Sequence, residues 1–188
     1  VGSEMCIRDR SNPCNPTGQV VQDYRLRSWV EVATETGCSM IMDEHYSHFI
    51  YNETNNPHNI VTASQFVDDV ETSPILIIDG LTKNWRYPGF RVSWTLGPKS
   101  VIETIASAGS FLDGGANHPF QIEASALLDP EHTLAETAAI QKTFKRKREY
   151  MLERLHNIGI TADAVPGGAF YIWANLSDLP APLNDGMT

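Results

Sequence analysis

Long hydrophobic runs, cysteines and positive charge are all scarce in this sequence of 188 residues. No apolar run approaches the ~20 residues that a membrane-spanning helix needs, so a membrane is not an expected partner. The three cysteines, Cys6, Cys14 and Cys38, form no CxxC pair, which argues against a disulfide framework or a cysteine-built zinc site and favours a reducing, cytoplasmic location. Lys and Arg number 14 against 23 Asp and Glu, and the net charge of −9 argues against a nucleic-acid partner.

Three glycine motifs that mark common enzyme classes are also missing. GxGxxG, GxxxxGK[ST] and GxSxG do not occur, which removes the dinucleotide-binding, P-loop and hydrolase-elbow interpretations. The apolar content of 41% is sufficient for a packed core. At the usual ~100–200 residues per domain, the length allows one large domain or two small ones.

Strand and helix patterns alternate through the first two thirds of the chain. Apolar spacing predicts a helix over 22–36, and short apolar runs predict strands at 38–42, 75–78 and 92–96, the last followed by a helix over about 98–109. Such alternation is typical of an α/β domain with a largely parallel sheet. Ligands of these sheets bind where the strands reach their carboxyl ends.

The later part of the chain predicts a long helix and the beginning of a second lobe. Asp129 can cap a helix that runs from Pro130 to about Asn157 and bridges two lobes. Its basic run at 145–148 is expected to be a solvated helix face rather than a polyanion site. A turn rich in glycine at 166–173 then feeds a strand.

The first candidate for chemistry is Lys83, which follows the apolar strand that ends at Asp79. A lysine among apolar and aromatic neighbours is partly desolvated, which favours the neutral amine that forms imines. Arg91, eight positions later, could hold a phosphate through its fork of donors. The alternative is a surface lysine and a structural arginine.

Two further candidates follow the first apolar strand. Asp43 at the strand end could pair with a heteroaromatic N–H⁺, and Tyr46 could reach another atom of the same ring. A rival interpretation uses Asp43 with His45 and His48 as metal ligands, but no further ligand motif supports it. The segment NPCNPTG at 12–18 is either a plain turn or a rigid loop that aims the Asn15 side chain into a cleft.

Taken in order, these residues resemble the class I and II aminotransferases of the fold-type I pyridoxal-phosphate (PLP) superfamily. The matching features are NPxNPTG at 12–18, D-x-x-Y at 43–46, and Lys83 followed eight positions later by Arg91. Each motif alone is weakly specific, whereas the ordered set is specific. The resemblance extends from about Ser11 to the end of the chain and includes GGAFY at 167–171, which resembles the start of the family's small-domain strand pair.

The resemblance implies a role for each matching residue. Lys83 would form a Schiff base with PLP and, once freed by the substrate amine, move the α-proton. Asp43 would pair with the pyridine N–H⁺ and keep the ring cationic, so that it accepts electrons. Asn15 and Tyr46 would hydrogen-bond the 3′-oxygen of the ring, and Arg91 would hold the phosphate.

The resemblance also divides the chain. Residues 1–10 do not match and lack the apolar core of a secretory signal, so they are set aside as a leader. Residues 11–128 correspond to the second half of the PLP-binding large domain, 129–157 to the bridging helix, and 158–188 to the beginning of a small α+β domain. Family chains are longer at both ends, where they supply a phosphate loop, a ring that stacks on the cofactor, and an arginine for the substrate carboxylate.

One departure within the matched region concerns the phosphate. Gly80 stands where the family usually has a hydroxyl residue three positions before the lysine, and Thr82 would place a hydroxyl nearby instead.

The implied function is amino-group transfer between an amino acid and a 2-oxo acid, in a cytoplasmic homodimer that uses PLP. Other reactions on the same scaffold, such as a carbon–sulfur β-lyase or a decarboxylase, stay open. So do a catalytically inert fragment and a PLP-binding regulatory module. The isolated 188 residues are expected to bind PLP weakly and to turn over little.

Overall fold

A computed structural model describes residues 6–51, 56 and 58–177 of the chain. The predicted end of the second lobe, residues 180–188, lies outside them. The helices and strands follow in the order β1 (Ile7–Ser11), α1 (Asp23–Thr36), β2 (Ser39–Asp43), η1 (Ala63–Phe66), β3 (Ile75–Gly80), η2 (Pro88–Phe90), β4 (Ser93–Leu96), α2 (Lys99–Leu112), α3 (His118–Leu127), α4 (Pro130–Asn157), β5 (Thr161–Ala162) and β6 (Ala174–Asn175).

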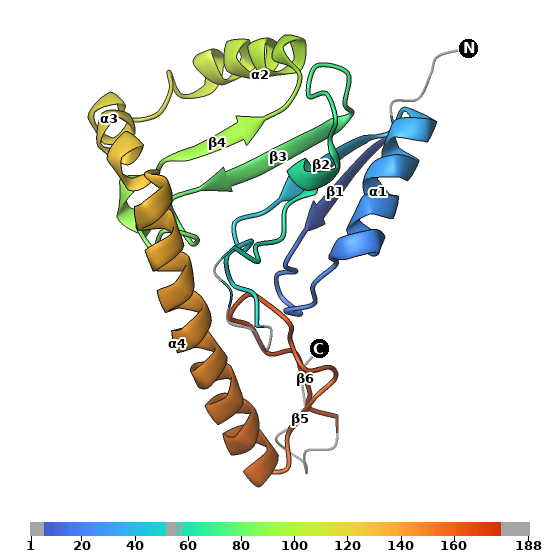
Figure 1. The fold of residues 1–188 in the computed structure, drawn as a ribbon, viewed down its shortest axis with the longest axis vertical. Coiled ribbons are helices and arrows are strands. Elements are labelled where there is room, and N and C mark those ends of the chain that lie inside the picture. The colour runs from blue at the N-terminus through green and yellow to red at the C-terminus, as the bar shows by residue number, and fades with distance from the viewer. Residues whose placement is uncertain (1–5, 52–55, 57, 178–188) are drawn as a thin grey trace.

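The first four strands form one mixed sheet in the order β1-β2-β3-β4 (Figure 1). β1, β2 and β3 are parallel, and β4 runs antiparallel to β3. In the ladder Ser11 pairs with Asp43, and Asp43 pairs with Ile78. This register brings the carboxyl ends of the three parallel strands to one edge of the sheet, as the sequence predicted for its ligand-binding edge.

The edge strand β1 includes residues 7–10, which the sequence interpretation set aside as a leader. Its sequence, IRDRS, has no apolar face, and the side chains of residues 7–10 are exposed. The strand is paired through its backbone, because parallel hydrogen bonds do not depend on side-chain hydrophobicity. Apolar patterning therefore gave no signal for it.

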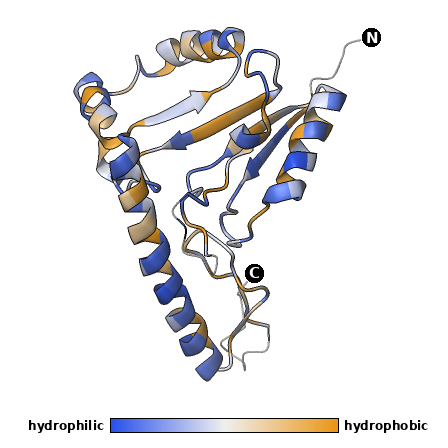
Figure 2. Cartoon of the chain, viewed as in Figure 1, coloured by the Kyte–Doolittle hydropathy of each residue, from blue (hydrophilic) through white to orange (hydrophobic). Residues whose placement is uncertain are grey.

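The core beneath the sheet is made by helix α1. Leu26, Val30 and Ala33 are its buried residues, and they pack in one cluster with Met42 and Ile77 of the central strands. Figure 2 shows the corresponding pattern, with β3 strongly apolar and α1 alternating between apolar and polar positions. α1 ends as predicted, because Gly37 adopts the left-handed conformation with φ 63°.

The other two helices beside the sheet fit the sequence prediction less closely. α2 begins one residue after its predicted start and extends three residues beyond its predicted end, and it has no fully buried residue. α3 was not predicted. It begins at a cap where the Asn117 side chain accepts a hydrogen bond from the Phe120 amide at 3.1 Å, and Ala124 is its buried residue.

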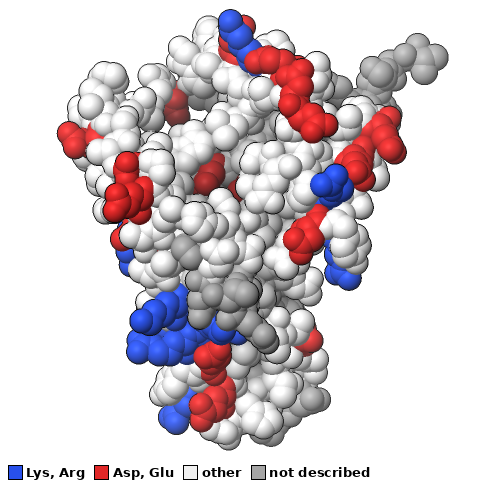
Figure 3. Space-filling view, in the orientation of Figure 1, with Lys and Arg blue, Asp and Glu red and all other residues white. Residues whose placement is uncertain are grey.

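The long helix α4 has the predicted bounds. The Asp129 side chain caps it by accepting from the His132 amide at 3.0 Å. Figure 1 shows α4 running from α3, beside the sheet, to the small β5–β6 pair at the far end of the molecule. Figure 3 shows Lys and Arg gathered over the half of α4 that lies away from the sheet. Domain boundaries at 128 and 157 stay a prediction.

None of the helices that the structure describes is both long and apolar enough to cross a membrane.

Candidate functional site

The carboxyl end of β2 carries Asp43, whose Oδ1 is held by the residue two positions later. The His45 amide donates to this oxygen at 3.2 Å, and His45 Nδ1 lies 3.1 Å from it. The hydrogen bond from the His45 side chain lowers the pKa of Asp43 below its ordinary value, against the opposing effect of burial. Asp43 is therefore ionised at neutral pH, and its side chain keeps 48% of its surface exposed.

The carboxyl end of β3 leads into the segment that carries Lys83. The Lys83 Nζ lies 5.4 Å from the centroid of the Phe170 ring, a distance typical of a cation–π contact. Lys83 has no carboxylate partner within 4.0 Å among the described residues. Its charge nevertheless reaches the end of β2, because it lowers the pKa of His45 while Asp43 and Asp79 raise it.

Asn84, which sequence analysis did not single out, ties the two strand ends together. Its side chain is completely buried. Nδ2 donates to the Glu44 carbonyl at 3.0 Å and to Asp79 Oδ1 at 2.9 Å, with Ser47 Oγ also 3.0 Å away. Oδ1 accepts from the His48 amide at 3.2 Å. The residue after Lys83 thus fixes the loop after Asp43.

Tyr46 joins the site to the segment beyond α4. Its hydroxyl lies 2.6 Å from the Tyr171 hydroxyl, and its ring meets the Phe170 ring edge-on at 5.2 Å. Burial, followed by the hydrogen bond to Tyr171, raises the pKa of Tyr46 above its ordinary value. Phe170 therefore contacts both Tyr46 and Lys83, which lie 37 residues apart in the sequence.

The loop at 12–18 lies at the same sheet edge, but its two asparagines differ. Asn12 is buried and exchanges two hydrogen bonds with the Val21 backbone, at 2.7 and 2.9 Å, so its role is structural. Asn15 is exposed, and its amide donates to Ser11 Oγ at 3.3 Å. Because Ser11 pairs with Asp43, Asn15 follows directly from the edge that holds the aspartate.

Packing between glycines closes this loop against the segment beyond α4. The Gly168 amide donates to the Gly18 carbonyl at 3.0 Å. A Cβ on Gly168 would lie 2.6 Å from the Phe49 carbonyl oxygen, and one on Gly18 would lie 2.4 Å from the Pro166 Cβ. Only glycine permits both close approaches.

Two predicted phosphate residues lie nearby without joining this cluster. Arg91 is exposed and donates to the Pro88 carbonyl at 3.1 Å, and Thr82 is half-buried. Within the part of the chain that the structure describes, no recorded hydrogen bond or ion pair links either of them to Lys83 or Asp43.

Two further acids of the region are withdrawn from solvent: Glu44 is buried and Asp79 is half-buried. Burial raises the pKa of Glu44 and of Asp79 to about 7. The charge of Asp43 also raises both pKa values, and the charge of Asp79 raises that of Glu44. The Glu44 carboxylate accepts from the Ala63 amide at 2.7 Å, and Asp79 accepts from the Gly80 amide at 2.6 Å. A protonated, neutral carboxyl is thus within reach at neutral pH.

The two histidines of the rival metal interpretation turn to different partners. His45 faces Asp43, whereas His48 is buried, with Nδ1 3.1 Å from the Thr137 hydroxyl of α4 and its ring 4.8 Å from Trp85. Burial lowers the pKa of His48 to about 4, so its ring is neutral. Among the described residues, no group of three His, Cys, Asp or Glu side chains is arranged to hold a metal.

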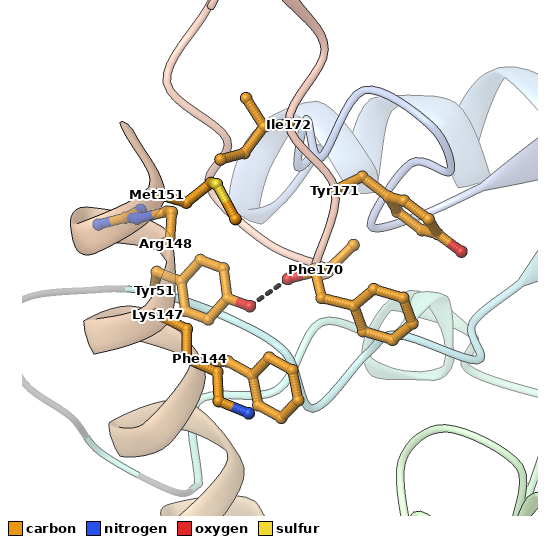
Figure 4. Close-up of a pocket in the computed structure, with 9 residues that line it drawn as sticks. Tyr51, Phe144, Lys147, Arg148, Met151, Phe170, Tyr171 and Ile172 are labelled. Atoms are coloured by element: carbon orange, nitrogen blue, oxygen red, sulfur yellow. Dashed lines mark hydrogen bonds between the residues drawn. The ribbon is translucent and has the colours of Figure 1, made fainter. Parts of the chain in front are cut away.

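An apolar cavity of about 400 Å³ lies between α4 and the segment beyond it (Figure 4). Phe144 and Met151 of α4 line it together with Phe170 and Ile172. Tyr51 also lines it, and its hydroxyl donates to the Ala169 carbonyl (Figure 4). Phe170 is therefore part of the wall of this cavity and also contacts Lys83.

Sequence reasoning missed Asp79 and Asn84 as parts of the site. Asp79 had a signal, because it ends its apolar strand as Asp43 ends the preceding one. Asn84 had a weaker one, a polar residue between Lys83 and Trp85, and its buried hydrogen bonds reach residues 36 to 40 positions away.

Comparison with known proteins identifies the family. Its sequence profile, described as "Aminotransferase class I and II", matches residues 11–184. The aspartate aminotransferase of Streptomyces avermitilis is 27% identical over 168 residues, which are 89% of this chain and 40% of that protein. The LL-diaminopimelate aminotransferase of Oleidesulfovibrio alaskensis is 26% identical, covering 88% of this chain and 41% of that protein.

Solved structures agree. The aspartate aminotransferase of Thermus thermophilus with maleate superposes with a TM-score of 0.80 at 26% identity, over 94% of this chain and 44% of that one. The chain thus spans about two fifths of the length of the relatives it matches. Its mixed sheet with flanking helices is part of a fold-type I aminotransferase large domain. The chain belongs to the class I and II aminotransferase family.

Proposed function

We propose that the protein transfers an amino group between an amino acid and a 2-oxo acid, with PLP held at Lys83. The observation that carries the proposal is the convergence of a lysine amine and an ionised carboxylate at one sheet edge. Lys83 and Asp43 both shift the pKa of the His45 imidazole, and Asn84 connects the two loops that carry them. In the class I and II aminotransferase family, the motifs that match this lysine and this aspartate bind PLP.

The residues present fit the cofactor. An amine without a carboxylate partner among the described residues is free to bind an aldehyde carbon. A carboxylate with one oxygen open and a lowered pKa can accept from a ring N–H⁺. Tyr46 adds a hydroxyl beside the same Phe170 ring that Lys83 contacts.

Each residue then has a task of its own. PLP supplies an aldehyde and an electron-withdrawing ring. Lys83 would hold the aldehyde carbon through its amine and, when that amine is free, would carry a proton. Asp43 would hold the proton on the ring nitrogen, and Tyr46 would donate to the ring oxygen. Asn15, Thr82 and Arg91 are the residues we assign to the ring oxygen and the phosphate, from their matching positions in the family motifs.

The names of the relatives guide the choice of substrates. They include aspartate, aspartate/prephenate and LL-diaminopimelate aminotransferases. Aspartate with 2-oxoglutarate is therefore the first pair to test. The homodimer and the cytoplasmic location that the resemblance implies stay predictions, and sedimentation of the intact protein tests the first.

Borohydride reduction of the intact protein with PLP, followed by peptide mapping, tests the site. We expect the label on Lys83 and its loss in Lys83→Arg. Lys99→Arg is the matched control, because Lys99 is exposed on α2 and lies 3.9 Å from Glu103. A label on Lys99 or on any other lysine would overturn the assignment. Formation of ammonia and pyruvate without amino transfer would reject transamination.

A further inference from the structure

The bond between His45 and Asp43 is asymmetric about the carboxylate. Both N–H groups that reach Asp43 from His45, the amide at 3.2 Å and Nδ1 at 3.1 Å, are directed to Oδ1. Oδ2 has no hydrogen-bond partner among the residues that the structure describes. Two donors on one oxygen fix the rotation of the carboxylate, since turning it would break both bonds.

We propose that His45 is a positioning residue for Asp43: it holds Oδ1 so that Oδ2 is the oxygen offered to the ring nitrogen of the cofactor, and its own charge weakens that bond. The inference rests on the proposed function. His45 does not itself touch the reacting atoms, and it acts through the carboxylate.

The charges around His45 give the direction of the effect. Asp43 of β2 and Asp79 of β3 raise its pKa, the bond to Asp43 being the largest cause, whereas burial and the charge of Lys83 lower it. A cationic ring nitrogen on the other oxygen of Asp43 would add a further positive charge close to the imidazole. Each cation then disfavours the other, because both depend on the same carboxylate.

The proton on His45 and the proton on the ring nitrogen are therefore coupled. When His45 is protonated, its carboxylate is already neutralised and holds the ring proton less strongly. When His45 is neutral, Nδ1–H still donates to Oδ1, so the carboxylate keeps its orientation and its full charge is available to the ring.

Two substitutions separate orientation from charge. His45→Asn can place its Nδ2–H where Nδ1–H was, so it keeps a donor to Oδ1 and removes the titration. His45→Ala removes the side-chain donor and the titration, and leaves the backbone amide as the donor of residue 45 to Oδ1. His118→Gln, on the exposed start of α3, is the matched control.

The first readout is the His45 pKa, measured by side-chain NMR in the intact protein. We expect it to fall by about 1 unit or more in Asp43→Asn. We also expect it to fall when PLP is added to the unsubstituted protein. An unchanged His45 pKa in Asp43→Asn, or after PLP is added, overturns the inference.

The second readout is the pH dependence of the absorbance of bound PLP. The absorbance transition whose midpoint equals the His45 pKa should be absent in both His45 variants. The affinity for PLP should be retained in His45→Asn and reduced several-fold in His45→Ala. Equal affinity and an unchanged pH profile in His45→Ala would also overturn it. Borohydride labelling distinguishes the two failures. If Lys83 is not labelled in the unsubstituted protein, the proposed function is refuted. If Lys83 is labelled but the His45 pKa and the effect of the His45 variants are unchanged, only the role of His45 is refuted.

Discussion

Replacement of Asn84 by alanine should be among the most damaging single changes at the strand ends. The side chain is fully buried and bonds to groups of both loops, so its removal takes a hydrogen bond from each of those groups. The His48 amide would lose its recorded acceptor and become an unsatisfied buried donor, at about 1–3 kcal/mol. Asp79 would lose one of two donors, a bond to a carboxyl group worth about 1.5–3 kcal/mol.

The Glu44 carbonyl does not enter this sum, because the Ser47 amide also donates to it at 2.9 Å. The two remaining losses give a destabilisation of about 2.5–6 kcal/mol, a large part of the 5–15 kcal/mol by which domains are typically stable. Urea unfolding of the intact protein, followed by tryptophan fluorescence, measures the change. Asn157→Ala, at the exposed end of α4, is the control and should stay within about 0.5 kcal/mol of the unsubstituted protein.

Asn84→Asp tests whether the donors matter rather than the volume. It keeps the shape but removes both N–H groups and adds a negative charge beside Asp79, so we expect it to be at least as damaging as alanine and to worsen as the pH rises. A loss below about 1 kcal/mol in Asn84→Ala, or full stability in Asn84→Asp, would refute the view that this amide joins the strand ends.

Three further outcomes follow from the same contacts. Gly168→Ala should lower the free energy of unfolding by about 1–3 kcal/mol, because the new Cβ would lie 2.6 Å from a backbone oxygen. Gly109→Ala is the matched control: it has open space around it in α2 and should raise the free energy of unfolding by about 0.5–1 kcal/mol. Thermal unfolding that ranks the two variants the other way would contradict the packing. The pKa of Asp79 is raised from 3.8 to about 7, so the folded state binds this proton more tightly and stability falls as the pH rises from about 4 to about 7. Asp79→Asn should reduce that fall, as measured by urea unfolding at several pH values. An unchanged dependence of stability on pH would contradict the burial of this carboxyl. Tyr171→Phe should lower the free energy of unfolding by about 1 kcal/mol and bring the pKa of Tyr46 closer to its ordinary value, because it removes the hydrogen bond between the two hydroxyls. Ultraviolet titration of the phenols measures the pKa. An unaltered titration would contradict the hydrogen bond between Tyr46 and Tyr171.

The sequence sufficed for those features that are repeated locally. The parallel strands at 39–43 and 75–80 were predicted because each is an apolar run that ends in an acid, and α1 because its apolar spacing stops at Gly37. The family was predicted from the order of three motifs, since ordered spacing is far more specific than any one of them.

The remaining features depend on contacts that local patterns do not record. The residues that pair in Tyr46–Tyr171 lie 125 positions apart, and neither has a neighbour that signals the other. β1 was missed because its charged residues pair through backbone alone, and α3 because its short sequence has weak periodicity. Asn84 gained its role only when two loops met.

The contacts that hold the candidate site together differ in strength, and this difference determines which parts of the site move most easily. The loops that carry Asp43 and Lys83 are held together by Asn84 through bonds buried from solvent, and breaking the one from the His48 amide leaves an unsatisfied donor. Phe170, which covers Lys83, keeps 41% of its surface exposed and contacts the site through ring edges that reform easily. The spacing of acid and amine is therefore the more costly to change, whereas Phe170 can be displaced from Lys83 at a lower cost.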